Sequence, residues 1–423
     1  MLSREDNDVL TRVGPGTVMG TYLRRFWLPF ALASELPAPD CPPVRVKLLG
    51  EHLVAFRTSA GQLGLLAENC PHRGASLFFG RNEEAGLRCV YHGWKFDSSG
   101  ACLDMPNEPA ESNFKHKVRV TAYPCAERGD ILWAYLGPAE HAAQIPELEW
   151  MHVPQNQRWV SKRLQRCNYM QSLEGELDSS HVGFLHSRPN PESQPTVDLR
   201  NSISEWMMRD KTPHLSTKQT DSGMIIGARR DAEPGSYYWR VTQYLLPTYT
   251  MIPPGTDEVI HFTAAIPIDD ENMMGFTMTW SPSGPLSERV LAEIASMTGI
   301  HMEVDPKSFL PVRNRENDYN IDRNLQRLGR LYTGIKGVRE EDHAVQEGMG
   351  AIYDRTKEHL GTSDLAVIQA RRRLLTAARA LQSGEEPYAA SHGEAYRVRS
   401  ASVILPHQVI WEEGAAEALV AQV

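Results

Sequence analysis

Two short motifs place four metal-binding side chains near the start of the chain. They are Cys70-Pro71-His72 and Cys89-Val90-Tyr91-His92, with sixteen residues between them. Two thiolates and two imidazoles suit a two-iron, two-sulfide cluster with the cysteines on one iron and the histidines on the other. The same ligands would also suit a structural zinc ion in a tetrahedral site, and the ligands by themselves favour neither metal. At 423 residues, the chain is long enough to carry further domains.

The charge and composition exclude several classes of protein. The formal net charge is −9, which argues against nucleic acid as a partner because phosphate binding needs a basic patch. No apolar run reaches the roughly 20 residues that span a bilayer, and the N-terminus lacks the basic-then-apolar shape of a signal peptide. We therefore expect a cytoplasmic protein without a membrane or nucleic-acid partner. The remaining cysteines are scattered singly, which predicts buried thiols: Cys41, Cys102, Cys125 and Cys167.

The hydrophobic pattern changes along the chain and predicts three segments. Residues 1–30 have a helical pattern, and residues 31–150 have short alternating strands joined by turns, with both motifs at loop positions. Residues 151–423 combine longer strands with helices, which predicts an antiparallel sheet flanked by helices and an α+β fold. The expected helices cover residues 168–182, 339–352 and 364–382, and the expected strands cover 236–252, 259–268 and 274–281.

A second group of polar residues follows the predicted helix 168–182. Its members are Asn168, Gln171, Glu174, Asp178 and His181. At about 100° per residue these residues share one side of a helix. The alternative to a functional site is a polar helix face exposed to solvent. His186 would point about 140° away from His181 on an ideal helix, but Gly183 could distort the helix and bring both rings together. Two histidines and a carboxylate form the facial triad of non-haem Fe(II) oxygenases.

The two groups together resemble the Rieske non-haem iron aromatic-ring oxygenases. The loop Cys70-Pro71-His72-Arg73-Gly74, the run His92-Gly93-Trp94, and the series Glu174, Asp178, His181 and His186 carry the resemblance. It implies a Rieske [2Fe-2S] cluster on Cys70, Cys89, His72 and His92. It also implies a mononuclear Fe(II) on His181, His186 and a carboxylate from a C-terminal helix. Asp342 matches that third position best, with Glu341, Asp354 and Asp364 as competitors.

The resemblance also implies an architecture. An N-terminal all-β Rieske domain would precede a helix-grip-like catalytic domain, on which residues 1–30 would pack. Asp178 would join His181 to a cluster histidine of a neighbouring subunit, which implies a homotrimer or a hexamer of two trimers. Asn168 and Gln171 would lie near the iron.

The segments 14–29, 77–83 and 352–360 are similar to the phthalate dioxygenase branch. The resemblance implies a terminal oxygenase (alpha) subunit that receives electrons from a separate NADH-dependent flavin and iron–sulfur reductase and uses O₂ to hydroxylate an aromatic carboxylate. O-demethylation or ether cleavage of a methoxylated or phenoxy aromatic acid is the alternative. A zinc-stabilised binding protein without redox activity is a third hypothesis. Candidate substrate contacts are cationic, at Arg209, Arg229, Arg230 and Arg240, or apolar, at Met207, Met208, Tyr244 and Met251.

Overall fold

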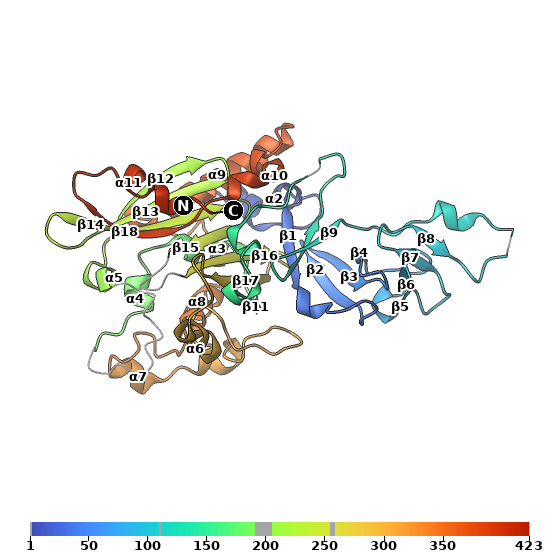
Figure 1. Cartoon of the computed structure of the whole chain (residues 1–423), viewed down its shortest axis with the longest axis horizontal. Helices are drawn as coiled ribbons and strands as arrows, with labels where there is room; N and C mark the ends of the chain where they lie inside the picture. The colour runs from blue at the N-terminus through green and yellow to red at the C-terminus, as the bar shows by residue number, and fades with distance from the viewer. Residues whose placement is uncertain (1, 110, 142, 191–204, 254–258, 423) are drawn as a thin grey trace.

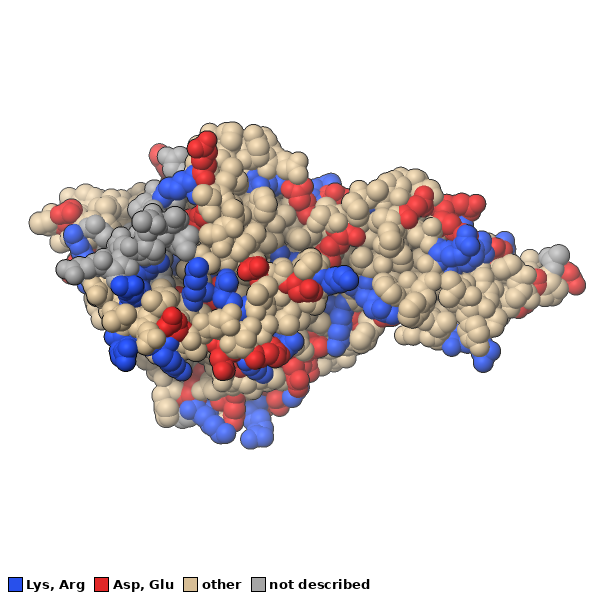
Figure 2. All heavy atoms as spheres, turned by 90° about the horizontal axis from the view of Figure 1, so that it is seen from below, with Lys and Arg blue, Asp and Glu red and all other residues tan. Residues whose placement is uncertain are grey.

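The computed structural model describes residues 2–109, 111–141, 143–190, 205–253 and 259–422. Figure 1 shows a small lobe of short strands, drawn in blue and cyan, beside a larger lobe built around one long sheet. Lysine and arginine side chains are interspersed with acidic ones over the face in Figure 2. No helix in the described ranges is long and apolar enough to cross a membrane.

Three antiparallel sheets form the small lobe, which confirms the predicted all-β domain. Their orders are β1–β10–β9, β2–β3–β4 and β5–β6–β7–β8. Apolar residues alternate with charged ones in β2, where Val46 and Leu48 are buried and Lys47 is exposed. The strands are β1 (Trp27–Leu32), β2 (Val44–Leu48), β3 (Glu51–Arg57), β4 (Leu63–Ala67), β5 (Arg81–Glu83), β6 (Gly86–Arg88), β7 (Lys95–Asp97), β8 (Cys102–Asp104), β9 (Cys125–Arg128) and β10 (Ile131–Tyr135).

One antiparallel sheet forms the centre of the larger lobe, in the order β11–β17–β16–β15–β14–β13–β12, with β18 beside β14. The run 236–252, predicted as one strand, is two strands with a turn between them. The turn contains Pro247, whose ring nitrogen cannot donate to a ladder. The strands are β11 (Arg158–Gln165), β12 (His214–Thr220), β13 (Gly223–Asp231), β14 (Ser236–Leu245), β15 (Tyr249–Ile252), β16 (Ile260–Pro267), β17 (Met273–Trp280) and β18 (Ala401–Pro406).

Helices cover this sheet. The long α9 lies against β12 and β13, and the N-terminal α1 and α2 pack on α9. The start of the chain therefore packs on the larger lobe, although its last residues already belong to β1. The boundaries at residues 30 and 150 stay predictions. The helices are α1 (Arg4–Thr11), α2 (Val18–Leu23), α3 (Tyr169–Leu177), α4 (Val182–Leu185), α5 (Glu205–Arg209), α6 (Glu288–Ser296), α7 (Arg323–Arg327), α8 (Val338–Gly348), α9 (Leu365–Gln382), α10 (Tyr388–Ser391) and α11 (Trp411–Gly414).

Candidate metal centres

The two cysteine–histidine loops share one backbone design. In each loop a glycine N–H donates to the carbonyl of the cysteine four residues earlier, from Gly74 to Cys70 at 2.9 Å and from Gly93 to Cys89 at 3.0 Å. The cysteine N–H closes each turn by donating to the carbonyl just beyond the glycine, at 2.8 Å in both loops. Both glycines have positive φ, 75° and 78°, which a side chain disfavours. The loops are two matching turns that present their metal-binding side chains.

The side chains of these loops converge in pairs. Burial, together with the neighbouring thiol of Cys89, raises the pKa of Cys70 to about 11. The ring centroids of His72 and His92 lie 4.5 Å apart, and Nδ1 of His92 is buried without a hydrogen-bond partner. Trp94 stacks on His72 at 4.3 Å. A thiol pair beside an imidazole pair fits a [2Fe-2S] cluster with two cysteines on one iron and two histidines on the other.

The spacing of the donor atoms distinguishes this cluster from zinc. Tetrahedral zinc, with bonds of about 2.0–2.3 Å, would hold all four donor atoms within about 4 Å of one another. Among the described residues, three histidine, cysteine or carboxylate donors lie within 4.8 Å of one another at His181, His186 and Asp342, and no three of the loop ligands do so. The four loop ligands are therefore spread more widely than one zinc ion would hold them, which favours the cluster.

The second site begins where α3 ends. The helix stops at Leu177, and Asp178 caps it with an extended backbone. The carboxylate of Asp178 accepts from the N–H groups of Ser180 at 2.6 Å and His181 at 3.2 Å, which turns the chain out of the helix. The predicted helix 168–182 is therefore too long. The break lies at Asp178 and not at Gly183, which lies inside α4.

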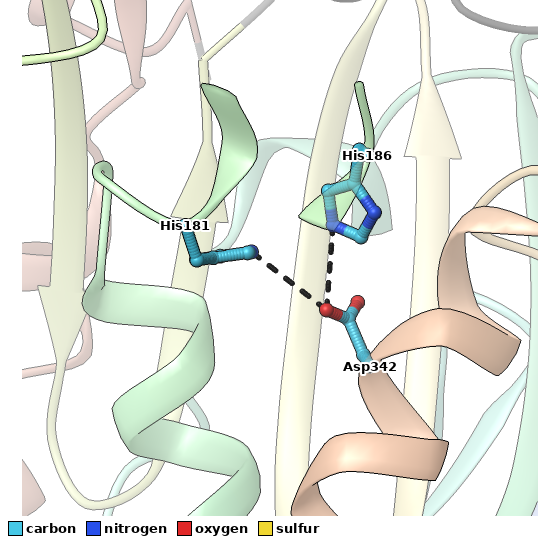
Figure 3. A group of neighbouring side chains, drawn as sticks. All are labelled: His181, His186 and Asp342. Atoms are coloured by element: carbon cyan, nitrogen blue, oxygen red, sulfur yellow. Dashed lines mark ion pairs between the residues drawn. The ribbon is translucent and has the colours of Figure 1, made fainter. Parts of the chain in front are cut away.

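This turn brings both histidines to a carboxylate on α8 (Figure 3). Oδ1 of Asp342 lies 3.7 Å from Nε2 of His181 and 3.3 Å from Nε2 of His186. Burial raises the pKa of Asp342, but His186, Arg339 and His181 outweigh burial and hold it well below its usual value. Burial lowers the pKa of His186, but Asp342 and Glu341 outweigh that effect and raise it to about 9. Both shifts show that the surroundings of Asp342 favour positive charge beside it, and the donor set of two histidines and a carboxylate fits a facial triad for divalent iron.

The other predicted carboxylates have different roles. Glu341 is buried, and its carboxylate accepts from Nδ1 of His186 at 2.8 Å and from Thr333 Oγ1 at 2.7 Å. Glu341 therefore lies behind the ring of His186, a place typical of a carboxylate that orients a candidate ligand, whereas the sequence offered Glu341 as a competing ligand. The two remaining competitors accept hydrogen bonds within their own turns, Asp354 from Thr356 and Asp364 from Gly361.

Asn168 lies at the opposite end of α3 from His181. Its side chain caps the helix by accepting from the N–H of Met170 at 3.1 Å. It also donates to the carbonyls of Thr11 at 2.9 Å and Asp270 at 2.7 Å. The expectation that Asn168 lies near the iron is corrected by these contacts, which join α3 to α1 and to the β16–β17 turn.

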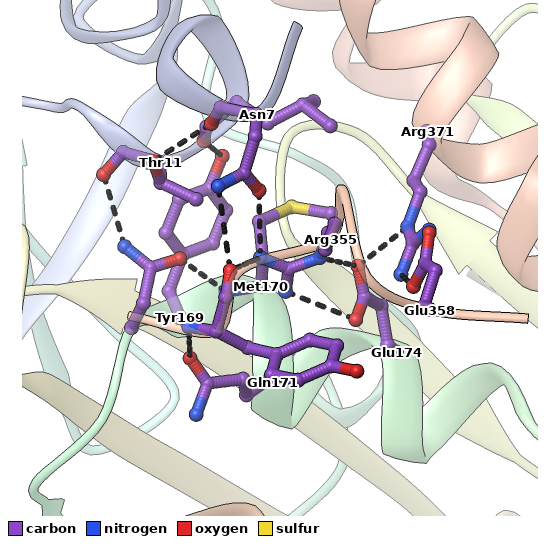
Figure 4. A network of polar contacts seen from close by, with 12 residues as sticks. Asn7, Thr11, Tyr169, Met170, Gln171, Glu174, Arg355, Glu358 and Arg371 are labelled. Carbon is purple, nitrogen blue, oxygen red and sulfur yellow. Dashed lines mark hydrogen bonds and ion pairs between the residues drawn. The ribbon is translucent and has the colours of Figure 1, made fainter. Parts of the chain in front are cut away.

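Gln171 and Glu174 also hold α3 in place (Figure 4). Gln171 donates to the carbonyls of Gln346 and Gly350, at 2.8 and 2.9 Å. Glu174 accepts two hydrogen bonds from Arg355, at 2.9 and 3.0 Å, and one from Arg371 at 2.7 Å. These residues position the helix that leads to His181 and His186, and the contacts named here do not involve either histidine or Asp342.

A cavity lies beside the three ligands. Its described lining includes the apolar Val182, Met207 and Ile252 and the polar Arg240 and His261. Among the predicted apolar contacts, Met207 lines this cavity, Tyr244 and Met251 belong to the main hydrophobic core, and Met208 packs near Met207.

Of the four predicted arginines, Arg240 lines the cavity. Arg230 is buried and donates to the carbonyl of Ser179, two residues before His181, at 2.8 Å. Arg209 and Arg229 lie over the rings of Trp206 and Tyr237. Sequence reasoning did not find His261, Glu341 as a histidine partner, or Arg339, which pairs with Glu176 and Asp342. The alternation of side chains along the strands could have indicated His261. The charged run 339–343 of α8 could have indicated Arg339 and Glu341.

Comparisons with known proteins agree with this geometry. The family described as "Rieske [2Fe-2S] domain" matches residues 26–124, and "LigXa C-terminal domain like" matches residues 134–422. The chain is 37% identical to the 3-chlorobenzoate-3,4-dioxygenase oxygenase subunit of Comamonas testosteroni, over 97% of each chain. It is 37% identical to the phthalate 4,5-dioxygenase oxygenase subunit of Pseudomonas putida, over 98% of this chain and 94% of the relative.

Further relatives extend the range of reactions. The chain is 32% identical to the 5,5'-dehydrodivanillate O-demethylase oxygenase subunit of a Sphingobium species, over 92% of this chain and 83% of the relative. The solved structure of dicamba monooxygenase bound to dicamba matches with a TM-score of 0.61 at 16% identity, over 86% of this chain and all of that one. The chain therefore belongs to the Rieske non-haem iron oxygenases, as a terminal oxygenase subunit of the phthalate dioxygenase-like branch. Members of this family use a Rieske cluster and a mononuclear iron.

Proposed function

We propose that this oxygenase subunit hydroxylates the ring of an aromatic carboxylate of the phthalate or benzoate type. The supporting observation is the guanidinium of Arg240 in the cavity beside the iron ligands. Burial lowers the pKa of Arg240, and its hydrogen bond to a described residue is a long one, 3.4 Å to Thr242 Oγ1. Across the described ranges no carboxylate pairs with it. Glu176 and Asp178 act on Arg240 from a distance, and a buried cation without a directly paired carboxylate leaves its N–H donors open to an anionic ligand.

A substrate carboxylate would satisfy Arg240 and orient the ring. Two parallel N–H to oxygen bonds, each worth about 1.5–3 kcal/mol, would fix both the position and the plane of the acid. Val182, Met207 and Ile252 would then surround the apolar ring. Arg339 is the other cavity arginine, and it already pairs with Glu176 and Asp342.

The two metal groups define the rest of the proposal. When bound, the cluster supplies single electrons and the iron supplies a site for O₂ beside the substrate. Cys70, Cys89, His72 and His92 would hold the cluster, and His181, His186 and Asp342 would hold the iron. As an oxygenase subunit of a multicomponent system, the chain needs a separate electron-transfer protein, for which we propose an NADH-dependent reductase with flavin and iron–sulfur groups.

We also propose a homotrimer, or a hexamer of two trimers, in which Asp178 joins His181 to a cluster histidine of the next subunit. Oδ2 of Asp178 lies 3.4 Å from Nδ1 of His181, and 25% of the Asp178 side chain is exposed. A partly exposed carboxylate that already holds one imidazole has room to accept a hydrogen bond from a second.

The test is turnover of the holoprotein with a surrogate reductase on benzoate, 3-chlorobenzoate, phthalate and their neutral amides. Arg240→Gln should raise KM for the acids by about 10–100-fold and leave the amides unchanged, because one charge-assisted pair is lost. Arg229→Gln is the matched control, since Arg229 lies over Tyr237 in the same sheet. An unchanged KM for every acid in Arg240→Gln would refute the carboxylate proposal.

O-demethylation or ether cleavage of a methoxylated or phenoxy aromatic acid is the second candidate. The 32% identity with an O-demethylase oxygenase subunit over 92% of this chain favours it. The same cavity would serve both reactions, so the products separate them. Formaldehyde with a phenol indicates demethylation, whereas a cis-diol without formaldehyde indicates ring dioxygenation.

A further inference from the structure

A chain of hydrogen bonds crosses the strands beside the iron site. Nδ1 of His261 on β16 lies 3.0 Å from Oγ1 of Thr279, the residue directly opposite it on β17. The same hydroxyl lies 2.8 Å from Nε2 of His301. Nδ1 of His301 then lies 2.7 Å from Oγ of Ser161 on β11. Four side chains from separate segments thus form one continuous series of contacts.

The two ends of this series face different surroundings. His261 lines the cavity that contains the iron ligands. Thr279 and His301 are buried, with 1% and 2% of their surfaces exposed, and Ser161 is partly exposed at the outer end. The series therefore runs from the cavity to a partly exposed residue, Ser161, through two buried side chains.

Every member of the series can both donate and accept a hydrogen bond. Burial lowers the pKa of His261 to about 3, and burial also lowers the pKa of His301, so both rings are neutral. A neutral imidazole has one N–H donor and one acceptor nitrogen, and a hydroxyl donates once while accepting from another group. All the hydrogens can point toward the cavity, or all can point toward Ser161, and both arrangements satisfy every contact.

The oxygenase reaction needs such a route. Ring dioxygenation combines the substrate and O₂ with two electrons and two protons to give the cis-diol, and O-demethylation uses the same inputs to give a phenol, formaldehyde and water. The electrons arrive through the cluster. The protons must reach the iron side of the cavity, and a fixed relay would deliver them at one point of its lining.

We propose that His261, Thr279, His301 and Ser161 form the proton relay of the iron site. In one passage Ser161 takes a proton from solvent and His261 releases one from Nε2 into the cavity. Between them, each O–H or N–H bond that breaks is replaced by one to the next atom. Rotation of the hydroxyls and exchange of the ring tautomers then restore the starting arrangement. No electron moves along the relay, and the proposal depends on the oxygenase class and not on the substrate class.

Variants at Thr279 distinguish a role in proton transfer from a role in side-chain packing. Thr279→Val removes the middle hydroxyl at nearly constant volume, and Thr279→Ser keeps that hydroxyl. Thr250→Val on β15 is the matched control, because Oγ1 of Thr250 is buried without a hydrogen-bond partner.

The first readout compares each holoprotein by solid-state ¹⁵N NMR with labelled histidine. Thr279→Val should shift two imidazole signals, and Thr279→Ser and Thr250→Val should not. Unshifted signals in Thr279→Val would show that the series does not exist.

The second readout needs no substrate, so its outcome is independent of the proposed acid. The reduced holoprotein is mixed with O₂ in H₂O and in D₂O, and formation of hydrogen peroxide, which also consumes two electrons and two protons, is followed. The rate of a His181→Ala variant is subtracted to remove direct oxidation of the cluster. Thr279→Val should slow peroxide formation about tenfold or more and increase the solvent isotope effect, while both comparison variants stay within about twofold of the wild type.

A substitute variant covers the case in which Thr279→Val loses iron. His301→Gln then takes its place, because an amide can contact both hydroxyls but cannot take up a proton on one atom and release it from another. A wild-type rate and isotope effect in the variant that retains iron would overturn the relay.

Discussion

Glu341 accepts a hydrogen bond from Nδ1 of His186 at 2.8 Å, and this contact determines which ring nitrogen faces the metal site. Nε2 is left to face Asp342 at 3.3 Å. Because Thr333 donates to the other oxygen of Glu341, the carboxylate cannot rotate freely. Carboxylates placed behind a histidine ligand in this way orient its ring and increase its basicity.

Glu341→Gln should therefore weaken iron binding by about 10–100-fold while the cluster is retained. The amide can still accept from His186, but it removes the negative charge that favours a cationic site. Iron retained against chelators of increasing strength measures the effect. Glu340→Gln is the matched control, since Glu340 is buried in the same helix and pairs with Arg313. Equal iron loss in the two variants would contradict a specific role for Glu341.

The convergence of His181, His186 and Asp342 could be predicted from the sequence, whereas the contacts behind these side chains could not. Motif spacing indicated His181 and His186, and the family resemblance indicated Asp342. The adjacent carboxylates Glu341 and Asp342 differ in the direction that each takes from α8, which the sequence does not give. The end of α3 was mispredicted because helical spacing continues to His181. The Asp178 side chain competes with the helix there by accepting from the backbone after it. That competition depends on local geometry that periodicity does not contain.

The four candidate arginines show a similar limit of prediction from the sequence. The strand pattern placed several of them on the large sheet, and the antiparallel sheet is present. Alternation along a strand assigns side chains to one face or the other, but it does not say which part of a face borders a cavity. Arg240 and Arg230 are both buried, and only their tertiary contacts show that Arg240 lines the cavity while Arg230 holds Ser179.

Gly93→Ala should reduce the cluster content, and Gly74→Ala should reduce it much less. Both positions have positive φ, so each substitution adds strain of about 1–2 kcal/mol. A Cβ at Gly93 would also lie 2.5 Å from Cγ of Pro106, whereas nothing lies within 4 Å of a Cβ at Gly74. The two loops are otherwise matched, which makes each variant the control for the other. Iron and sulfide per chain, with the visible absorption of the cluster, measure the difference, and equal losses would show that the contact with Pro106 does not matter.

Glu174→Gln should lower the free energy of unfolding by about 3–5 kcal/mol, because it leaves the buried Arg355 without its counter-ion, while Arg371 keeps its pair with Glu358. Denaturant unfolding measures the loss. Asp354→Asn is the control, since the pair of Asp354 with Lys357 is exposed and worth about 0–1 kcal/mol.

The same network predicts a pH dependence. Burial raises the pKa of Glu174, but Arg355 and Arg371 outweigh burial and hold it below its usual value of 4.5. A carboxylate with a lowered folded-state pKa stabilises the fold fully above its unfolded-state pKa. That stabilisation is lost as the pH falls through the folded-state value. The wild type should therefore lose more stability than Glu174→Gln when the pH falls below about 4.5. Parallel losses in the two proteins would assign the acid sensitivity to other groups.

Asp178→Asn should leave both metal sites filled and lower turnover by about 10–100-fold. The amide oxygen can still accept from the N–H of Ser180, the shorter of the two bonds that end α3, so the turn should be kept. What it loses is the charge that would hold two imidazoles, His181 and a cluster histidine of the next subunit. The measurement is the rate at which the reduced cluster is oxidised after O₂ is added to the substrate-bound protein, together with iron content. Asp305→Asn is the control, because Asp305 also accepts from the backbone N–H two residues later, that of Lys307, and lies in an exposed turn. Full turnover in Asp178→Asn would exclude the bridging role, and slow turnover with a normal rate of cluster oxidation would place the defect after electron transfer.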